Sequence, residues 1–330
     1  MSSRFILVGD LGGTKARLAV YEVSNGWFRR RDTETYRCAD YDRFEAIIQK
    51  FLTDHPISVT RACLGVPGPV SAGLFKMTNL PWTLDATRIA EVTGIPEVRL
   101  VNDLLATAAA LPHLKAEDLE TLYPGKGTRS PQAPCAVLAP GTGLGQAFLV
   151  YGDGRPVPLS SEGSHVDFAP AGERELELWS YLHKRYGHVS YERVLSGPGL
   201  LNLYEFLRDS GTAPEPPELA QELARADDRP AVVAQHALNG TSELCVQALE
   251  WFVALLGAQA GNLVLTLNAT GGVYLAGGIP TKIEPKLTNE RLLPAYLNKG
   301  RLTDLVEKAP IFLIKNEYAP LLGAAQLAVL

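Results

Sequence analysis

Two α/β domains are the fold that this 330-residue sequence predicts. Apolar strand patterns alternate with helical patterns in the first third of the chain, and residues 136–151 repeat the strand, turn and strand pattern of residues 5–21. The chain is also longer than one typical domain. With 46% hydrophobic and 20% charged residues, it can bury a sizeable core.

The chain begins with a predicted β-hairpin over residues 5–21. The apolar run Phe5–Val8 leads into a tight Gly/Thr corner, and residues 16–21 resume as a second extended run. The corner Gly12–Thr14 would let backbone N–H groups approach a phosphate closely, and the carboxylate of Asp10 could reach a metal ion. The sequence matches neither common phosphate-loop motif, so an ordinary hairpin is the alternative.

Helical and extended patterns then alternate up to the middle of the chain. Residues 42–53 carry apolar side chains at helical spacing, and residues 61–70 predict a buried strand that runs into a Pro/Gly corner. A helix over 84–93, a strand over 98–101 and an alanine-rich helix over 104–111 follow. This order predicts the α/β layer of the first domain.

Asn102 and Asp103 stand at the end of the predicted strand 98–101, just before a helix. Open α/β sheets place ligand chemistry at this point, which makes Asp103 a candidate catalytic carboxylate. An Asp in this position is also a common N-cap residue, so a purely structural role is the alternative.

A loop rich in Pro, Gly and Ser over residues 123–134 separates the two halves, and the second half begins as the first does. A strand over 136–139, a Gly/Thr corner over 140–145 and a strand over 146–151 repeat the opening pattern. Two such corners about one domain length apart suggest two phosphate-holding loops that face each other across a cleft.

The remaining elements are mostly helical. In chain order, they are a helix over 176–186, a segment over 191–195 that leads to a Gly-Pro-Gly turn at 197–199, and a surface insertion over 209–230 with one short helix. They continue with two long helices over 231–267, a strand over 273–279 that ends in paired glycines, a segment over 302–308, a strand over 311–314, and a closing helix over 320–330.

Charge and cysteine content exclude several classes of function. The net charge of −5 and the lack of a basic run argue against a nucleic-acid partner. The four cysteines are far apart and form no zinc-binding pattern, which is typical of reduced thiols in the cytoplasm. Polar residues interrupt the most apolar window, 251–267, so it predicts a core helix and no membrane partner. The N-terminus has no signal-segment pattern.

Six motifs occur in one order over nearly the whole chain. They are Gly9–Thr14, Val101–Asp103, Gly141–Gly145, Glu162–Phe168, Gly187–Gly199 and Leu275–Ile279. Each is weak alone, but the ordered set resembles the bacterial glucokinase family of the hexokinase/actin-like ATP-binding superfold.

The resemblance implies a two-domain, actin-like ATPase (ribonuclease H-like) fold, in which each domain is a mixed β-sheet flanked by helices and the ligand cleft lies between the domains. We expect a small α/β domain over residues 1–112 plus 316–330 and a large one over residues 113–315. Family members are commonly homodimers, which implies the same state for this chain.

The resemblance further implies an ATP-dependent glucokinase that phosphorylates D-glucose at the 6-hydroxyl to glucose 6-phosphate, the first step of glycolysis. Phosphoryl transfer to a hydroxyl needs a proton acceptor, and Asp103 would be this general base. The sugar would be bound by Asn79, Asn102, Asp103, Glu162, His165 and Glu192. ATP would be bound by Gly9, Asp10, Leu11, Gly12, Gly13, Thr14, Gly141, Thr142, Gly143, Gly277 and Gly278.

Two cofactors, ATP and Mg²⁺, are therefore expected, with Asp10 holding the metal through water. The related repressor/open-reading-frame/kinase sugar kinases usually carry a Cys-rich zinc motif after Glu-x-x-His, whereas His165 is followed by Val-Asp-Phe. No structural zinc is expected. Those families also include repressors with a DNA-binding segment ahead of the first phosphate loop, which the position of Gly9 argues against.

Several alternatives stay open at this stage. Glu192 could be a surface carboxylate of a helix, His165 a structural histidine, and Gly277–Gly278 a helix-starting turn without a ligand. The substrate could be another hexose, such as mannose, fructose or an N-acetylhexosamine. The chain could also be a non-catalytic regulator that binds sugar and ATP on the same fold, or a filament-forming or chaperone ATPase.

Overall fold

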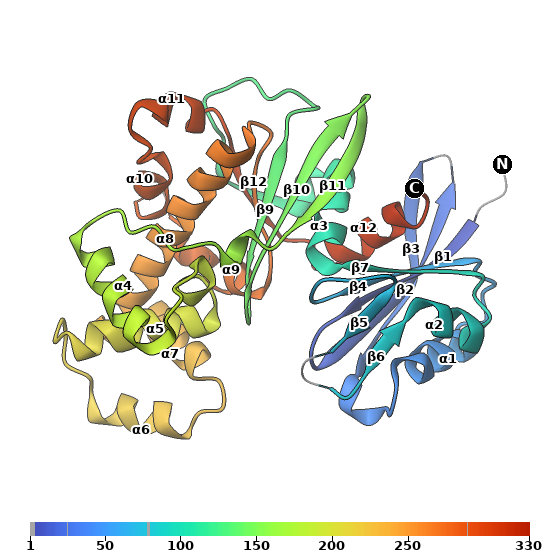
Figure 1. Cartoon of the computed structure of the whole chain (residues 1–330), viewed down its shortest axis with the longest axis horizontal. Helices are drawn as coiled ribbons and strands as arrows, with labels where there is room; N and C mark the ends of the chain where they lie inside the picture. The colour runs from blue at the N-terminus through green and yellow to red at the C-terminus, as the bar shows by residue number, and fades with distance from the viewer. Residues whose placement is uncertain (1–3, 25, 78–79, 289) are drawn as a thin grey trace. The chain divides into compact units, whose positions relative to one another are not determined.

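The computed structural model describes residues 4–24, 26–77, 80–288 and 290–330. The chain forms two compact units (Figure 1). The first comprises Met1–Ala116, Ala147–Ser160 and Asn316–Leu330, and the second comprises Glu117–Gln146 and Ser161–Lys315. The domain boundaries expected from the sequence, 1–112 plus 316–330 and 113–315, stay a prediction.

A five-stranded mixed sheet forms the centre of the first unit. Its strand order is β3 (Trp27–Arg37), β2 (Lys15–Ser24), β1 (Arg4–Leu11), β4 (Arg61–Val66) and β7 (Glu97–Asn102). The strands β1, β2 and β3 pair antiparallel, whereas β4 runs parallel to both β1 and β7. The predicted hairpin and the strands predicted over 61–70 and 98–101 are confirmed.

Helices cover both faces of this sheet (Figure 1). One face packs against α1 (Phe44–Asp54), α2 (Ala86–Thr93) and the small ribbon of β5 (Leu74–Lys76) and β6 (Thr83–Asp85). The other face packs against α3 (Asp103–Ala110) and α12 (Ala319–Leu327). Successive side chains of a strand point to opposite faces of the sheet, so alternate residues of each strand belong to the two hydrophobic cores.

Helices α3 and α12 pack unusually closely because Gly323 has no side chain. A Cβ atom built at Gly323 would lie 1.7 Å from the carbonyl oxygen of Ala106 on α3. We expect Gly323→Ala to lower the free energy of unfolding by about 3 kcal/mol, the upper part of the usual range for overpacking.

Urea denaturation measures this change. Gly172→Ala is the matched control, because a Cβ at Gly172 meets nothing within 4 Å, and it should cost under about 1 kcal/mol. Equal stability of the two variants would contradict the packing argument.

A six-stranded sheet repeats the strand order of the five-stranded one. Its order is β11 (Arg155–Ser161), β10 (Leu144–Gly152), β9 (Cys135–Pro140), β12 (Gly272–Leu275), β13 (Ile311–Ile314) and β8 (Leu119–Tyr123). The strand β12 runs parallel to both β9 and β13, and β8 joins antiparallel at the edge. The internal repeat predicted from the two Gly/Thr corners is therefore confirmed.

The 25-residue helix α8 (Glu243–Leu267) packs against α5 (Gly197–Asp209), α7 (Arg229–Asn239) and α10 (Leu292–Leu297). By length and composition α8 could cross a membrane, but 67% of its apolar window is buried within the protein, as in a core helix.

Four further α-helices belong to the described part of the second unit. They are α4 (Glu173–Tyr186), α6 (Pro217–Arg225), α9 (Gly278–Lys282) and α11 (Thr303–Val306). The short helix expected within the surface insertion over 209–230 is α6.

Two sequence expectations about the second unit are wrong. The Gly-Pro-Gly turn at 197–199 is the first turn of α5, capped by the hydroxyl of Ser196, which accepts the Gly199 N–H at 3.0 Å. Proline suits the first turn of a helix, where its missing N–H would have no partner. The strand predicted over 273–279 ends at Leu275, because the paired glycines lead into α9.

Candidate active site

Two candidate carboxylates of the first unit lie at the carboxyl ends of parallel strands. In the sheet register Asp10 on β1 is level with Gly65 on β4, which is level with Val101 on β7. Two strand spacings of about 4.8 Å place the backbones at Asp10 and Val101 about 10 Å apart. Asp103 follows two residues after Val101, so both carboxylates belong to the sheet edge where open α/β folds bind ligands.

Asn102 caps helix α3. Its Oδ1 accepts hydrogen bonds from the backbone N–H groups of Leu104 at 3.0 Å and Leu105 at 3.1 Å. Its Nδ2 donates to the carbonyl of Gly68 at 3.4 Å, a long and weak bond. The helix cap is therefore Asn102, and capping does not account for the carboxylate of Asp103.

Asp103 is the first residue of α3 and is half-buried. Its Oδ1 accepts the backbone N–H of Leu104 at 2.8 Å, and its carbonyl accepts the hydroxyl of Thr107 at 3.0 Å. A negative charge in the first turn is favoured by the helix dipole. The carboxylate is thus held in one orientation at the end of the sheet.

Substitution of Asn102 tests how much its capping hydrogen bonds contribute to the stability of the protein. Asn102→Ala removes the cap and should lower the free energy of unfolding by about 1 kcal/mol, whereas Asn102→Asp keeps an acceptor and should stay within about 0.5 kcal/mol of the parent. Chemical denaturation of the three proteins measures this. Equal losses in the two variants would show that the amide has another structural role.

Asp10 is a half-buried carboxylate on β1. No hydrogen bond or ion pair reaches it from any residue that the structure describes. Burial raises the pKa of Asp10, and the charge of Arg17, its neighbour on β2, offsets part of this rise. Arg17 itself bonds to Glu317, with 2.9 Å between Nη2 and Oε2. A half-buried carboxylate without its own cation suits a bound divalent ion.

The first Gly/Thr corner has an exposed tip, and the candidate residues Gly9 and Leu11 before it belong to β1. Gly12 and Thr14 are exposed, and the Gly12 N–H already donates to the carbonyl of Lys15 at 2.8 Å. Gly9 lies inside β1, where a Cβ would approach a methyl group of Leu64 to 2.7 Å. The glycine at position 9 is therefore explained by packing in the sheet.

Leu11, the other strand residue of this candidate set, is 1% exposed, so its side chain belongs to the core. Gly13 is half-exposed within the corner. Leu11 and Gly13 could therefore offer a ligand only their backbone groups.

The second corner is held in place by the start of α5. The N–H of Gly141 donates to the carbonyl of Gly143 at 2.7 Å and closes the turn between β9 and β10. The N–H of Gly197 donates to the carbonyl of Gly141 at 2.8 Å. Thr142 is exposed at the tip of this turn, which resembles the first corner in its exposed threonine.

Glu192 lies against this second corner. It belongs to the 3-10 turn Tyr191–Arg193, and its Oε2 accepts the backbone N–H of Leu144 at 2.9 Å. The carboxylate occupies the space in front of Gly143, where a Cβ would lie 2.6 Å from Oε2. The alternative of a carboxylate on a helix surface is wrong for Glu192.

Glu162 precedes the short 3-10 turn Gly163–His165, and His165 is the last residue of that turn. Both are exposed, and neither side chain has a hydrogen bond or ion pair within the described part of the chain. The backbone is fixed instead, since the carbonyl of His165 accepts from Nε2 of His188 at 3.0 Å. The side chains are therefore available to a ligand, and a buried structural role for His165 is excluded.

Gln146 is a polar residue that the sequence analysis did not single out. It is 3% exposed on β10, and its Nε2 has no hydrogen-bond partner among the residues that the structure describes. Its Oε1 lies 2.7 Å from where a Cβ of Gly163 would stand, next to the turn that carries Glu162 and His165. A glutamine within the apolar run Gln146–Tyr151 is the signal that could have identified it.

Gly277 and Gly278 form the start of α9. Gly277 has φ 85°, a conformation that favours glycine, and Gly278 has open space where its side chain would be. The conformation is the helix-starting turn that was the alternative for this pair, and a role in nucleotide binding stays a prediction. Asn79 lies outside the described residues.

Metal ligands are sparse. Across residues 4–24, 26–77, 80–288 and 290–330, no group of three or more His, Cys, Asp or Glu side chains is arranged to hold a metal. All four cysteines are buried, reduced thiols. A Mg²⁺ ion near Asp10 would therefore need phosphate and water oxygens for most of its ligands, as is usual for Mg²⁺ in phosphoryl-transfer sites.

Known proteins resemble this chain over nearly its whole length. The glucokinase of Nostoc sp. is 38% identical over 335 residues, covering 97% of each protein. The crystal structure of a glucokinase from an Antarctic psychrotroph is 30% identical, with a TM-score of 0.86 and 98% of each chain covered.

The crystal structure of a glucokinase from Balamuthia mandrillaris in complex with glucose is 22% identical. It covers 99% of this chain and 94% of its own, with a TM-score of 0.79, and at this identity it shows the fold alone. Together with the two repeated sheets, these likenesses confirm the predicted actin-like ATPase (ribonuclease H-like) fold.

The family model described as Glucokinase matches residues 7–330. Both this match and the 38% identity to a curated relative span almost all of the sequence. The chain therefore belongs to the glucokinase family.

Proposed function

We propose that this protein is an ATP-dependent glucokinase that converts D-glucose to glucose 6-phosphate, with Asp103 as the general base. Family membership supports the activity, and one structural observation carries the assignment of the base. Asn102 caps helix α3, so the carboxylate of Asp103 is placed at the sheet edge without being needed as the cap. A proton acceptor is what transfer to a sugar hydroxyl requires.

In the proposed reaction, the 6-hydroxyl oxygen of glucose attacks the γ-phosphorus of ATP. A new P–O bond forms, the bond between the γ-phosphorus and the bridging oxygen breaks, and ADP leaves with that electron pair. The hydroxyl proton passes to Asp103. Because one oxygen of Asp103 accepts the Leu104 N–H at 2.8 Å, the carboxylate has a fixed direction in which to receive the proton.

Glucose would be oriented by the other members of the candidate set. Glu162 and His165 are exposed side chains on one short turn, and Glu192 lies on the neighbouring turn Tyr191–Arg193. Carboxylates accept hydrogen bonds from sugar hydroxyls, and a fixed array of acceptors selects a hydroxyl geometry. Asn102 would donate through Nδ2, and Asn79 stays a candidate from the sequence.

The phosphates of ATP would lie along the two Gly/Thr corners, Gly12–Thr14 and Gly141–Gly143, with the adenosine near Gly277–Gly278. Asp10 fits a Mg²⁺ ion, directly or through water, because its half-buried carboxylate lacks a partner cation in the described residues. When bound, Mg²⁺ neutralises charge on the β- and γ-phosphate oxygens.

Three further properties are proposed on the family likeness alone. They are a homodimeric state, a cytoplasmic location, and the domain boundaries 1–112 plus 316–330 and 113–315. Sedimentation of the purified protein at several concentrations tests the first.

A sugar panel tests the proposed function. ADP release is followed with glucose, mannose, fructose and N-acetylglucosamine, each with and without ATP and Mg²⁺. We expect glucose to give the highest kcat/KM, with dependence on both ATP and Mg²⁺. A higher value for another hexose would reassign the substrate. Tight glucose binding without any ADP release would instead indicate a non-catalytic regulator.

A further inference from the structure

The segment Glu192–Gly197 is attached to the second Gly/Thr corner at two points. The side chain of Glu192 accepts the Leu144 N–H at 2.9 Å, on the carboxyl side of the corner. The N–H of Gly197 donates to the carbonyl of Gly141 at 2.8 Å, on the amino side. One bond on each side means that the segment and the corner hold each other in a single geometry.

The contact between Glu192 and the corner is also steric. A Cβ at Gly143 would stand 2.6 Å from Oε2 and 3.5 Å from Cδ of Glu192. Heavy atoms do not approach so closely without a shift, so a side chain at position 143 and the observed carboxylate position exclude one another. A side chain at position 143 would therefore require the Glu192 carboxylate to move away from the Leu144 N–H.

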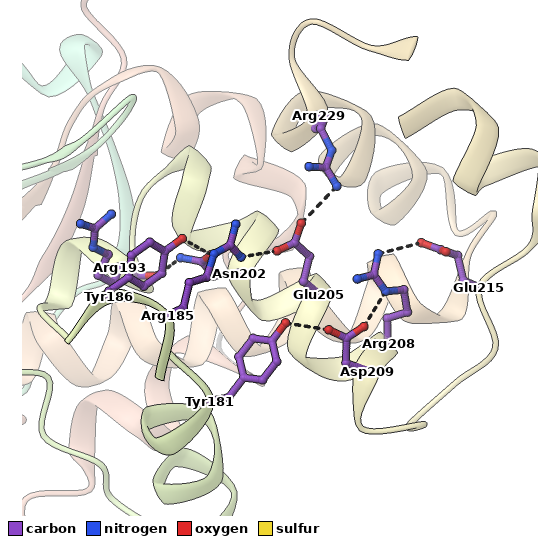
Figure 2. Close-up of polar contacts among 10 residues, drawn as sticks. All are labelled: Tyr181, Arg185, Tyr186, Arg193, Asn202, Glu205, Arg208, Asp209, Glu215 and Arg229. Carbon is purple, nitrogen blue, oxygen red and sulfur yellow. Dashed lines mark hydrogen bonds and ion pairs between the residues drawn. The ribbon is translucent and has the colours of Figure 1, made fainter. Parts of the chain in front are cut away.

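Two side-chain hydrogen bonds fix the backbone at Glu192 and Arg193. The hydroxyl of Ser196 donates to the carbonyl of Glu192 at 2.7 Å, and Nδ2 of Asn202 donates to the carbonyl of Arg193 at 2.8 Å. Oδ1 of Asn202 in turn accepts the hydroxyl of Tyr186 at 3.0 Å (Figure 2). The guanidinium of Arg193 lies over the ring of Tyr186, with its central carbon 4.1 Å from the ring centre.

This anchoring limits what the Glu192 carboxylate can do. With two consecutive carbonyls fixed, the side chain cannot move far by shifting its backbone. A change in the hydrogen bonding of the Glu192 carboxylate must therefore alter its bond to the Leu144 N–H, and with it the geometry of the corner.

We propose that Glu192 couples the two substrates: the carboxylate that receives a sugar hydroxyl also fixes the backbone of the corner that binds phosphate. The inference rests on the proposed function, which assigns sugar to Glu192 and phosphate to Gly141–Gly143. A hydroxyl that donates to this carboxylate restricts its rotation and preserves the bond to Leu144. The corner is then already ordered when nucleotide arrives, so that less entropy is lost on binding.

Thermodynamic linkage makes the effect reciprocal. If sugar raises the affinity for nucleotide through Glu192, nucleotide raises the affinity for sugar by the same factor.

The first test measures ADP binding by calorimetry in the absence of sugar. Glu192→Ala removes the acceptor of the Leu144 N–H and should weaken ADP binding about tenfold, as expected for a lost hydrogen bond to a charged group. Glu192→Gln keeps a carbonyl oxygen for that N–H and should bind ADP within about twofold of the parent. Both variants should bind glucose more weakly, since each lacks the carboxylate.

Unchanged ADP affinity in Glu192→Ala would overturn the proposal, because a residue that only binds sugar would behave in this way. Glu175→Ala is the matched control: Oε2 of Glu175 accepts the backbone N–H of Ala171 at 2.7 Å at the start of α4, which carries no candidate residue. It should leave both affinities unchanged.

The second test is a double-mutant cycle. Gly143→Ala should weaken the binding of both ADP and glucose, because the new Cβ displaces the Glu192 carboxylate. In a Glu192→Ala background the space is open, so Gly143→Ala should cost much less. Additive effects would overturn the proposal. If Glu192→Ala does not fold, Gly143→Ala alone decides, and unchanged affinity for both ligands would contradict the coupling.

These measurements separate the coupling from the proposed function. ADP binding without sugar reports on the corner whether or not the protein phosphorylates glucose. Parent protein that binds ADP but turns over no hexose would refute the glucokinase assignment, and the response of ADP affinity to Glu192→Ala would still report on the corner.

Discussion

Replacing Asp103 with asparagine should lower kcat for glucose phosphorylation by about 10²- to 10⁴-fold, the range expected when a general base is removed. Glucose should still bind within a few-fold of the parent affinity. Asparagine has the same shape and keeps an oxygen for the Leu104 N–H, which Asp103 accepts at 2.8 Å, so the start of α3 is preserved. What the amide cannot do at neutral pH is take the hydroxyl proton.

Steady-state kinetics with a coupled ADP assay and calorimetry with glucose measure the two halves of this prediction. Asp85→Asn is the control, since Asp85 is another carboxylate at the start of a helix: its Oδ1, at the N-cap of α2, accepts the Thr87 N–H at 2.9 Å. The control should retain parent kcat. A kcat of Asp103→Asn within about threefold of the parent would contradict the role of general base.

Replacing Asp10 with asparagine should make the protein more stable and much less active. Burial raises the pKa of Asp10 above its ordinary 3.8. The folded protein therefore binds this proton more tightly than the unfolded chain does. The contribution of Asp10 to stability is greatest below pH 3.8 and is lost as pH rises through the folded pKa.

At neutral pH the buried charge is therefore a cost, which Asp10→Asn removes. We expect a gain of about 1 kcal/mol in the free energy of unfolding at pH 7, in the range typical of relieved functional sites. Loss of the metal-binding carboxylate should lower kcat at saturating Mg²⁺ by about a hundredfold, equivalent to about 2.7 kcal/mol of transition-state stabilisation.

Denaturation at pH 7 and at acid pH, together with the Mg²⁺ dependence of turnover, measures both effects. Asp40→Asn is the control, because Asp40 is exposed, and it should change neither quantity. A variant that is less stable at pH 7 would show that Asp10 has a stabilising partner. Parent activity with parent Mg²⁺ dependence would remove Asp10 from the metal site.

Local patterns were sufficient for much of the fold. The helix predicted over 42–53 is α1, Phe44–Asp54, and the strand predicted over 311–314 is β13 with the same bounds. The helix α1 buries one apolar face at helical spacing, and β13 is an uninterrupted apolar run, so each pattern is visible in a short window. The repeat of strand, Gly/Thr corner and strand was visible for the same reason, and it foreshadowed two sheets with the same strand order.

Local sequence patterns do not predict edge strands or contacts between residues that are distant in sequence. The strand β3, Trp27–Arg37, has mostly exposed or half-exposed residues and is held by pairing with β2, so it lacks a clear apolar period. The Gly-Pro-Gly segment at 197–199 has the composition of a turn that ends a helix, yet the cap at Ser196 makes it the start of α5.

The candidate site shows the same division. Asp103 could be singled out because strand end, helix start and carboxylate coincide in a short window. The bond from Glu192 to Leu144 spans 48 positions, and no local pattern encodes it. The cap on α3 could have been either Asn102 or Asp103, since both residue types serve as N-caps, and only the hydrogen bonds decide for Asn102.

In the proposed reaction, Asp103 activates the 6-hydroxyl of glucose toward ATP. The most direct test is ADP release by the parent protein with glucose and with 6-deoxyglucose, which lacks only that hydroxyl. We predict ADP release with glucose in equal amount to glucose 6-phosphate formed, and none above the sugar-free rate with 6-deoxyglucose. Equal ADP release with both sugars would show that another hydroxyl, or water, is the acceptor and would contradict the account.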